Sequence, residues 1–156
     1  MPKTGNIEID FIYNFWKKEV IPPLYLALEL TPDDKLDWSP AEKMLSLGNI
    51  FMHISEAGAW WIDKKIYDKP YEDSTPGPSL PKDKIKELLD IHWNRLEEFL
   101  SRFPEIMKKT YSTTWQGKEY QLKGDWIMMH LLEHDIHHRC QINQYLRILG
   151  ITPPKI

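Results

Sequence analysis

Four histidines gather in one short stretch of this sequence, "HLLEHDIHHRCQINQYLRILG", which begins at residue 130. They are His130, His134, His137 and His138, and the whole chain has six histidines. Each residue turns an α-helix by about 100°, so His134 and His138 lie one above the other on a single face. That face is also the one closest to the apolar side of the predicted helix. Two imidazoles at this spacing can bind one metal ion, as they do in zinc helices of the H-E-x-x-H type.

A mononuclear metal site needs at least one further ligand from another part of the chain. Two histidines remain, His53 within "LGNIFMHISEAGAW" and His92 beside Trp93. His53 lies at the border of the apolar arc of its predicted helix, whereas His92 is interpreted as structural or exposed. The residue pattern alone leaves the third ligand open. His130 and His137 lie on the flank of the apolar face, so we interpret them as polar flanking groups or as groups that support the ligands.

Asp135 lies within the apolar arc of the same helix, where a carboxylate without partners would be costly. We expect it to orient a histidine or to contact a neighbouring helix, unless a slight rotation of the helix exposes it. Asp135, Glu56 and the flanking histidines are the general bases nearest to the predicted site. The sequence therefore identifies no catalytic residue.

Four helical segments are predicted to position these side chains. The hydrophobic spacing and the punctuation by Pro and Gly give residues 7–30, 39–62, 82–103 and 125–150. Pro22 and Pro23 are expected to bend or interrupt the first helix. We therefore predict an all-α protein, a four-helix bundle, in a single domain over residues 1–156.

The expected boundaries rest on local signals. "SPAE" offers Ser39 as N-cap, Pro40 at the first helical position and Glu42 to complete a capping box. Gly150 is a suitable residue to end the last helix. Between the third and fourth helices the connection is long, and "YSTTWQGKEYQL" alternates around a turn signal, which favours a short hairpin or an irregular crossover.

Composition excludes several classes of protein. The 156 residues carry a formal net charge of -3, and the pI is about 6.1, which argues against nucleic-acid binding through a basic surface. No apolar stretch is long enough to span a bilayer, and the first residues do not resemble a signal peptide. The single cysteine, Cys140, cannot form an internal disulfide. We expect a cytoplasmic protein without a membrane partner.

Two blocks of the sequence resemble the DinB-like (YfiT-like) proteins. "EHDIHHRCQINQYLRILG" is similar to their terminal helix, with a pattern close to H-[ED]-x-H-H-R-G-Q-I, and "DWSPAEKMLSLGNIFMHISEAGAWW" is similar to their second helix. The resemblance implies a four-helix bundle with a metal site of three histidines, here His53, His134 and His138. Cys140 stands where the family usually has Gly; its helical angle points away from the site, so we interpret it as a packing change.

The resemblance also implies a function. Three imidazoles suit a divalent transition metal, with zinc or nickel preferred and iron or manganese as alternatives. Similar proteins include metal-dependent enzymes, so we expect a small-molecule substrate, a low-molecular-weight thiol S-transferase or hydrolase activity, and a homodimer. The alternative is a non-catalytic bundle that binds a metal or a ligand in a stress response. A pocket open to the metal would favour the enzyme, whereas a sealed site would favour the binding module.

Overall fold

The computed structural model describes residues 7–72 and 76–155, and most of them are helical. The helical elements and two strands follow one another as α1 (Ile7–Phe15), η1 (Trp16–Val20), α2 (Ile21–Leu30), η2 (Asp33–Lys35), α3 (Leu47–Gly58), η3 (Ala59–Ile66), α4 (Lys82–Ser101), α5 (Phe103–Ile106), β1 (Thr110–Trp115), β2 (Lys118–Lys123) and α6 (Gly124–Ile148).

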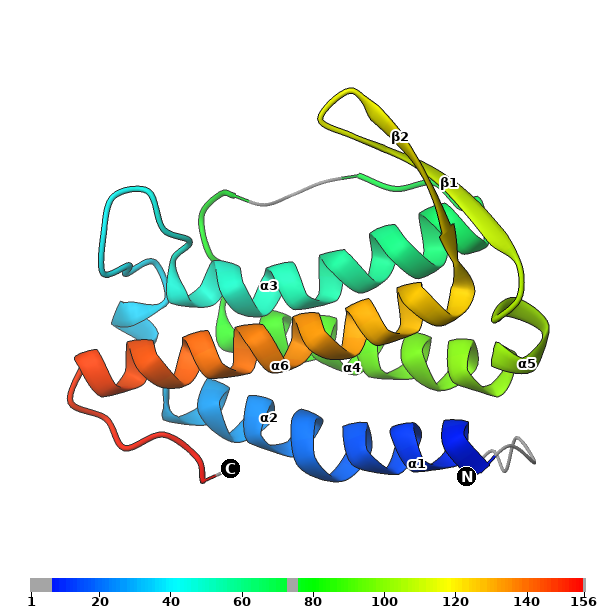
Figure 1. Ribbon diagram of the computed structural model, residues 1–156. Helices are drawn as coiled ribbons and strands as arrows, with labels where there is room; N and C mark the ends of the chain where they lie inside the picture. The colour runs from blue at the N-terminus through cyan, green and yellow to red at the C-terminus, as the bar shows by residue number, and fades with distance from the viewer. Residues whose placement is uncertain (1–6, 73–75, 156) are drawn as a thin grey trace.

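The long helices lie lengthwise beside one another (Figure 1). α3 packs against both α4 and α6, and α2 contacts the same two helices from the other side. α3 and α4 run in the same direction, because the chain returns along the length of the molecule between them, and α6 runs in the opposite direction. Large side chains fill the space between these helices, and the largest fully buried ones are Trp16, Phe51, Phe99 and Phe103.

The first helical segment is interrupted, as the prolines predict. η1 is a π-helical stretch that ends at Val20, one residue before Pro22 and Pro23, and the N–H of that intervening residue, Ile21, donates to the carbonyl of Trp16, five residues earlier. The prolines then occupy the first turn of α2, where a missing N–H costs little. The prediction of an interruption is confirmed, and the irregular backbone falls on the residues before the prolines.

The predicted start of the second helix is wrong. α3 begins at Leu47, and its N-cap is Ser46, whose Oγ accepts from the N–H of Asn49 at 3.3 Å. Ser39 instead donates to the carbonyl of Ala41 within a turn. Both Ser39 and Ser46 are suitable N-cap residues. The helix begins after Ser46, because the side chain of Asn49 in its first turn also bonds Gly77 on a distant loop. The helix then continues through η3, past its predicted end at residue 62.

The all-α prediction is confirmed in part: the protein is mainly helical, but β1 and β2 form an antiparallel hairpin between α5 and α6, so it is not purely α. The two turn residues, Gln116 and Gly117, have φ angles of 50° and 76°. Positive φ at both positions is the geometry that lets a two-residue turn match the twist of its strands. Of the two alternatives predicted for this segment, the short hairpin is confirmed and the irregular crossover is wrong, and the connection before the last helix is long, as predicted.

α6 carries most of the residues singled out in the sequence. It has 25 residues and ends as predicted, with Gly150 at φ 76°. The N–H groups of Gly150 and Ile151 donate to the carbonyls of Arg147 and Leu146, which is the Schellman arrangement. No helix in residues 7–72 and 76–155 is both long and apolar enough to cross a membrane.

The two competing caps give a direct test of the α3 boundary. Replacing Ser46 by Ala removes the hydrogen-bond acceptor for Asn49, so we expect Ser46→Ala to lower the free energy of unfolding by about 1 kcal/mol. Ser39→Ala should change it by less than about 0.5 kcal/mol, as at an ordinary surface position. Urea denaturation of both variants measures the difference, and an equal loss in the two would contradict the observed boundary.

Candidate metal centre

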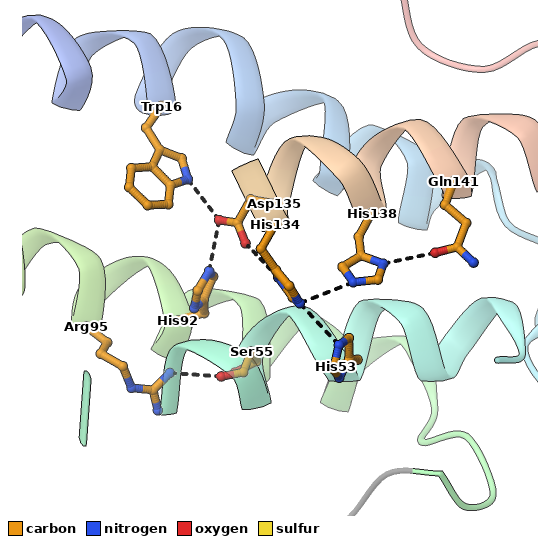
Figure 2. Close-up of polar contacts among 9 residues, drawn as sticks. All are labelled: Trp16, His53, Ser55, His92, Arg95, His134, Asp135, His138 and Gln141. Carbon is orange, nitrogen blue, oxygen red and sulfur yellow. Dashed lines mark hydrogen bonds and ion pairs between the residues drawn. The ribbon is translucent and has the colours of Figure 1, made fainter. Parts of the chain in front are cut away.

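Three imidazoles converge between α3 and α6 (Figure 2). The Nε2 atom of His134 lies 3.1 Å from Nε2 of His53 and 3.1 Å from Nε2 of His138. One ligand atom from each ring lies within 4.8 Å of the other two. Metal–nitrogen bonds of roughly 2.0–2.1 Å in a tetrahedral shell place neighbouring nitrogens about 3.3 Å apart. The three histidines predicted as ligands are therefore brought together, and their spacing suits a metal ion.

A chain of hydrogen bonds orients the ring of His138. Tyr145 Oη donates to the carbonyl of Leu45 at 3.2 Å, and the Gln141 amide nitrogen donates to Tyr145 Oη at 3.3 Å. The amide oxygen of Gln141 is then free to accept from Nδ1 of His138 at 2.9 Å. With its proton on Nδ1, His138 presents a bare Nε2 to the other two rings, which is the tautomer that a metal ligand requires.

Asp135 is completely buried beside this cluster. Its Oδ2 accepts from the indole N–H of Trp16 at 2.8 Å and from Nε2 of His92 at 3.1 Å. Burial by itself raises the pKa of Asp135, but the imidazoles of His92 and His134 outweigh burial and lower that pKa to about 2. Of the alternatives that the sequence left open, contact with neighbouring helices is confirmed and exposure is wrong.

His92 is structural and fully buried on α4. Its ring fits because Gly58 on α3 has no side chain, since a Cβ built there would lie 2.3 Å from Nδ1 of His92. His92 contacts Asp135 but does not belong to the cluster of three, so the choice of His53 over His92 agrees with the geometry.

An open pocket of about 200 Å³ lies against the cluster. Its walls come from one face of α6 and consist of His130, Glu133, His134 and His137. Burial, reinforced by the neighbouring His134, lowers the pKa of His130. The ring of His130 stacks on Trp126, with centroids 4.8 Å apart, and so connects the pocket to an aromatic surface. His137 is exposed.

Two further regions do not take part in the cluster. Cys140 is exposed and free, and it does not line the pocket, in agreement with its predicted direction. A larger pocket, of about 540 Å³, lies between the segments 33–37 and 79–83 and contains no histidine.

Sequence reasoning missed three residues that hold the site in place. Trp16 donates to Asp135, and Gln141 accepts from His138. Arg139 is buried and donates to the carbonyl of Glu19 in η1. Only Gln141 had a local signal, because it lies three residues after His138 on the same helix. Trp16 and Arg139 act across 119 and 120 residues of sequence, and no spacing rule links them to the cluster.

These observations define a mainly helical protein with a cluster of three histidines that can hold a metal ion. The model of the DinB family matches residues 1–156, so the chain belongs to the DinB family. The predicted resemblance is confirmed. A comparison with curated proteins gives no match.

Solved structures with the same fold agree with this assignment. A DinB-like protein from Bacillus subtilis superposes with a TM-score of 0.63 at 15% identity, over 92% of this chain and 95% of that one. A DinB-like protein from Bacillus cereus gives a TM-score of 0.64 at 19% identity, over 94% of this chain and 96% of that one. At these identities the similarity concerns the fold.

The buried ring of His138 predicts a loss of stability in acid. Burial, reinforced by the charge of His134, lowers the pKa of His138 from 6.5 to about 3. Between these values the unfolded chain binds a proton that the folded chain does not, so stability falls as the pH falls from about 6.5 toward 3. In the presence of a chelator, urea denaturation at pH 7 and pH 4.5 should show a loss from this group of about 1 to 2.5 kcal/mol.

Two asparagine variants isolate this contribution. His138→Asn should flatten the dependence of the unfolding free energy on pH, because the titrating ring is gone. His137→Asn should retain most of the wild-type dependence, since His137 is exposed on the same turn of α6 and its charge is the smallest of the influences that lower the pKa of His138. Parallel curves for wild type and His138→Asn would show that burial of this ring does not cause the acid sensitivity.

Proposed function

We propose that this DinB family protein is a metal-dependent enzyme that transfers a low-molecular-weight thiol to an electrophile. The observation that carries the proposal is the convergence of three Nε2 atoms, one of them from His134, which also lines an open pocket. A structural metal site is normally closed by four protein ligands, whereas a catalytic one keeps a position open. Three histidines beside a pocket support the second arrangement.

His53, His134 and His138 are the proposed ligands. Imidazole nitrogen suits zinc or nickel, with iron and manganese as alternatives, and neutral rings leave the cation its full charge. Such a cation supplies a Lewis acid that lowers the pKa of a thiol or a water molecule bound to it. The chain contributes the orientation of the ligands, through Gln141 for His138.

The pocket supports a small substrate. His134 belongs to both the cluster and the pocket wall, so a molecule in the pocket lies beside the proposed ligands. His130 and Glu133 line the same pocket. They are the proposed acceptors for the proton that a thiol loses when its sulfur bonds to an electrophilic carbon and the bond broken at that carbon leaves its electron pair on the displaced group. The exposed ring of Trp126, stacked on His130, supports an electrophile with an apolar or aromatic part.

Other features stay proposals of the same kind. We propose that residues 1–156 form one domain, with the four long helical segments arranged as a four-helix bundle around the core. The cytoplasmic location and the homodimer stay predictions. A hydrolase that uses the same cluster, or a module that binds metal without catalysis, is the outcome if the thiol assay below fails.

Metal content tests the proposed ligands. We expect His53→Ala, His134→Ala and His138→Ala each to lose stoichiometric zinc or nickel, because two imidazoles from this set do not complete a stable site. His137→Ala is the matched control, since it removes an exposed imidazole from the same helix. Elemental analysis of protein purified without a histidine tag measures the result. Equal metal in His138→Ala and wild type would rule out the ligand role.

Thiol consumption tests the reaction. Metal-loaded wild type should accelerate conjugation of small thiols with electrophiles, and chelated protein and His134→Ala should not. Cys140→Ser should retain the rate, because Cys140 is exposed and outside the pocket. If loaded and chelated protein give the same rates across a panel of thiols and electrophiles, the transferase proposal fails. If Cys140→Ser abolishes the activity, the nucleophile belongs to the chain and the proposed mechanism is wrong.

A further inference from the structure

Asp135 presents two oxygens with unequal partners. Oδ2 accepts from Trp16 and from His92, whereas among the described residues Oδ1 has no hydrogen-bond partner. Nδ1 of His134 is likewise buried without a partner in that part of the chain, and it lies 3.8 Å from Oδ1. This distance is too long for a hydrogen bond, and a shift of about 1 Å would make one. Figure 2 shows the carboxylate between the Trp16–His92 side and the His134 ring.

The tautomer of His134 links this pair of atoms to the cluster. A neutral imidazole carries one proton, so a bare Nε2 that binds a cation requires the proton on Nδ1. Nε2 of His134 points at the other two Nε2 atoms, and Nδ1 points at Oδ1 of Asp135. The tautomer that suits a cation therefore also directs an N–H toward a carboxylate oxygen that lacks a donor.

We infer that Asp135 is a positioning residue for His134. When Nε2 of His134 binds a cation, Nδ1–H donates to Oδ1, and the carboxylate fixes both the tautomer and the rotation of the ring. This inference rests on the proposed three-histidine metal site. Trp16 from η1 and His92 from α4 hold Oδ2, so the position of Oδ1 depends on helices that contribute no ligand.

The competing explanation is that Asp135 only ties helices together. The two explanations differ in which oxygen matters for the metal. If Asp135 only ties helices together, it acts through Oδ2. Removing a donor to Oδ2 and replacing Oδ1 would then change metal affinity by similar amounts, because both would act only by loosening the helix packing. A positioning carboxylate acts through Oδ1, and metal affinity then depends on Oδ1 far more than on the donors to Oδ2.

Zinc titration of two variants separates these explanations. We expect Asp135→Asn to weaken zinc affinity about 10- to 100-fold, measured by competition with a chromophoric chelator. Trp16→Phe is the matched control, because it removes a donor to Oδ2 and leaves the carboxylate. Trp16→Phe should weaken zinc affinity by less than about threefold. We expect this small effect even if the melting temperature of the metal-free Trp16→Phe variant falls as far as that of Asp135→Asn. Wild-type affinity in Asp135→Asn, or equal losses in both variants, would overturn the inference.

The tautomer of His134 can also be measured in the wild-type protein, so that this test does not depend on the folding of a variant. In ¹⁵N NMR spectra, zinc should place the His134 proton on Nδ1 and give it slower exchange with solvent than the ring protons of the exposed His137. A zinc-loaded His134 with its proton on Nε2, or an Nδ1 proton that exchanges as fast as those of His137, would overturn the inference. A wild type that binds no zinc would refute the metal site itself. Normal zinc binding with an unaltered Asp135→Asn refutes only the role of Asp135.

Discussion

The burial of one carboxylate constrains much of this structure. Asp135 is fully excluded from solvent, and a buried charge is tolerated only when hydrogen-bond donors surround it. Those donors come from η1 and α4, while Asp135 itself belongs to α6, so the charge is satisfied only when these elements pack together. Loss of either donor would leave the carboxylate incompletely satisfied. The imidazoles of the cluster lie on the opposite side of the same residue, which couples the packing of the core to the geometry of the site.

Two π-helical stretches, η1 and η3, carry side chains that pack around Asp135 and the histidine cluster. η1 carries Trp16, which reaches Asp135, and Glu19, whose carbonyl accepts from the buried Arg139. η3 carries Trp61, whose ring meets the edges of Trp126 and His130 at centroid distances of 5.7 Å and 5.3 Å. A π-helical turn changes the angular positions of its side chains relative to a regular α-helix. η1 continues directly into α2, whereas η3 ends its helical segment at Ile66. Both stretches lie beside the site.

The environment of the cluster differs from one side to the other. On the inner side, Gln141 and Tyr145 orient the ring of His138 by hydrogen bonds, and Oδ1 of Asp135 lies 3.8 Å from Nδ1 of His134. On the outer side, His134 opens onto the pocket with His130 and Glu133. Hydrogen-bonded support on one side and an open pocket on the other are features that the metal-dependent activity proposed above would require.

The sequence by itself determined most of the helical segments and the inward pair His134 and His138, and it gave the hairpin as one of two alternatives, because each depends on spacing along a short stretch of chain. Helical periodicity directs two imidazoles to one face, and Gln116 with Gly117 suits the turn between two strands. The start of α3 was not determined in this way, since two cap signals compete and long-range contacts select Ser46. Only the tertiary structure brought Trp16 and His92 to Asp135 and His53 to the pair on α6. These contacts join residues from separate helices, and their geometry depends on how the helices pack, which periodicity along one helix does not specify.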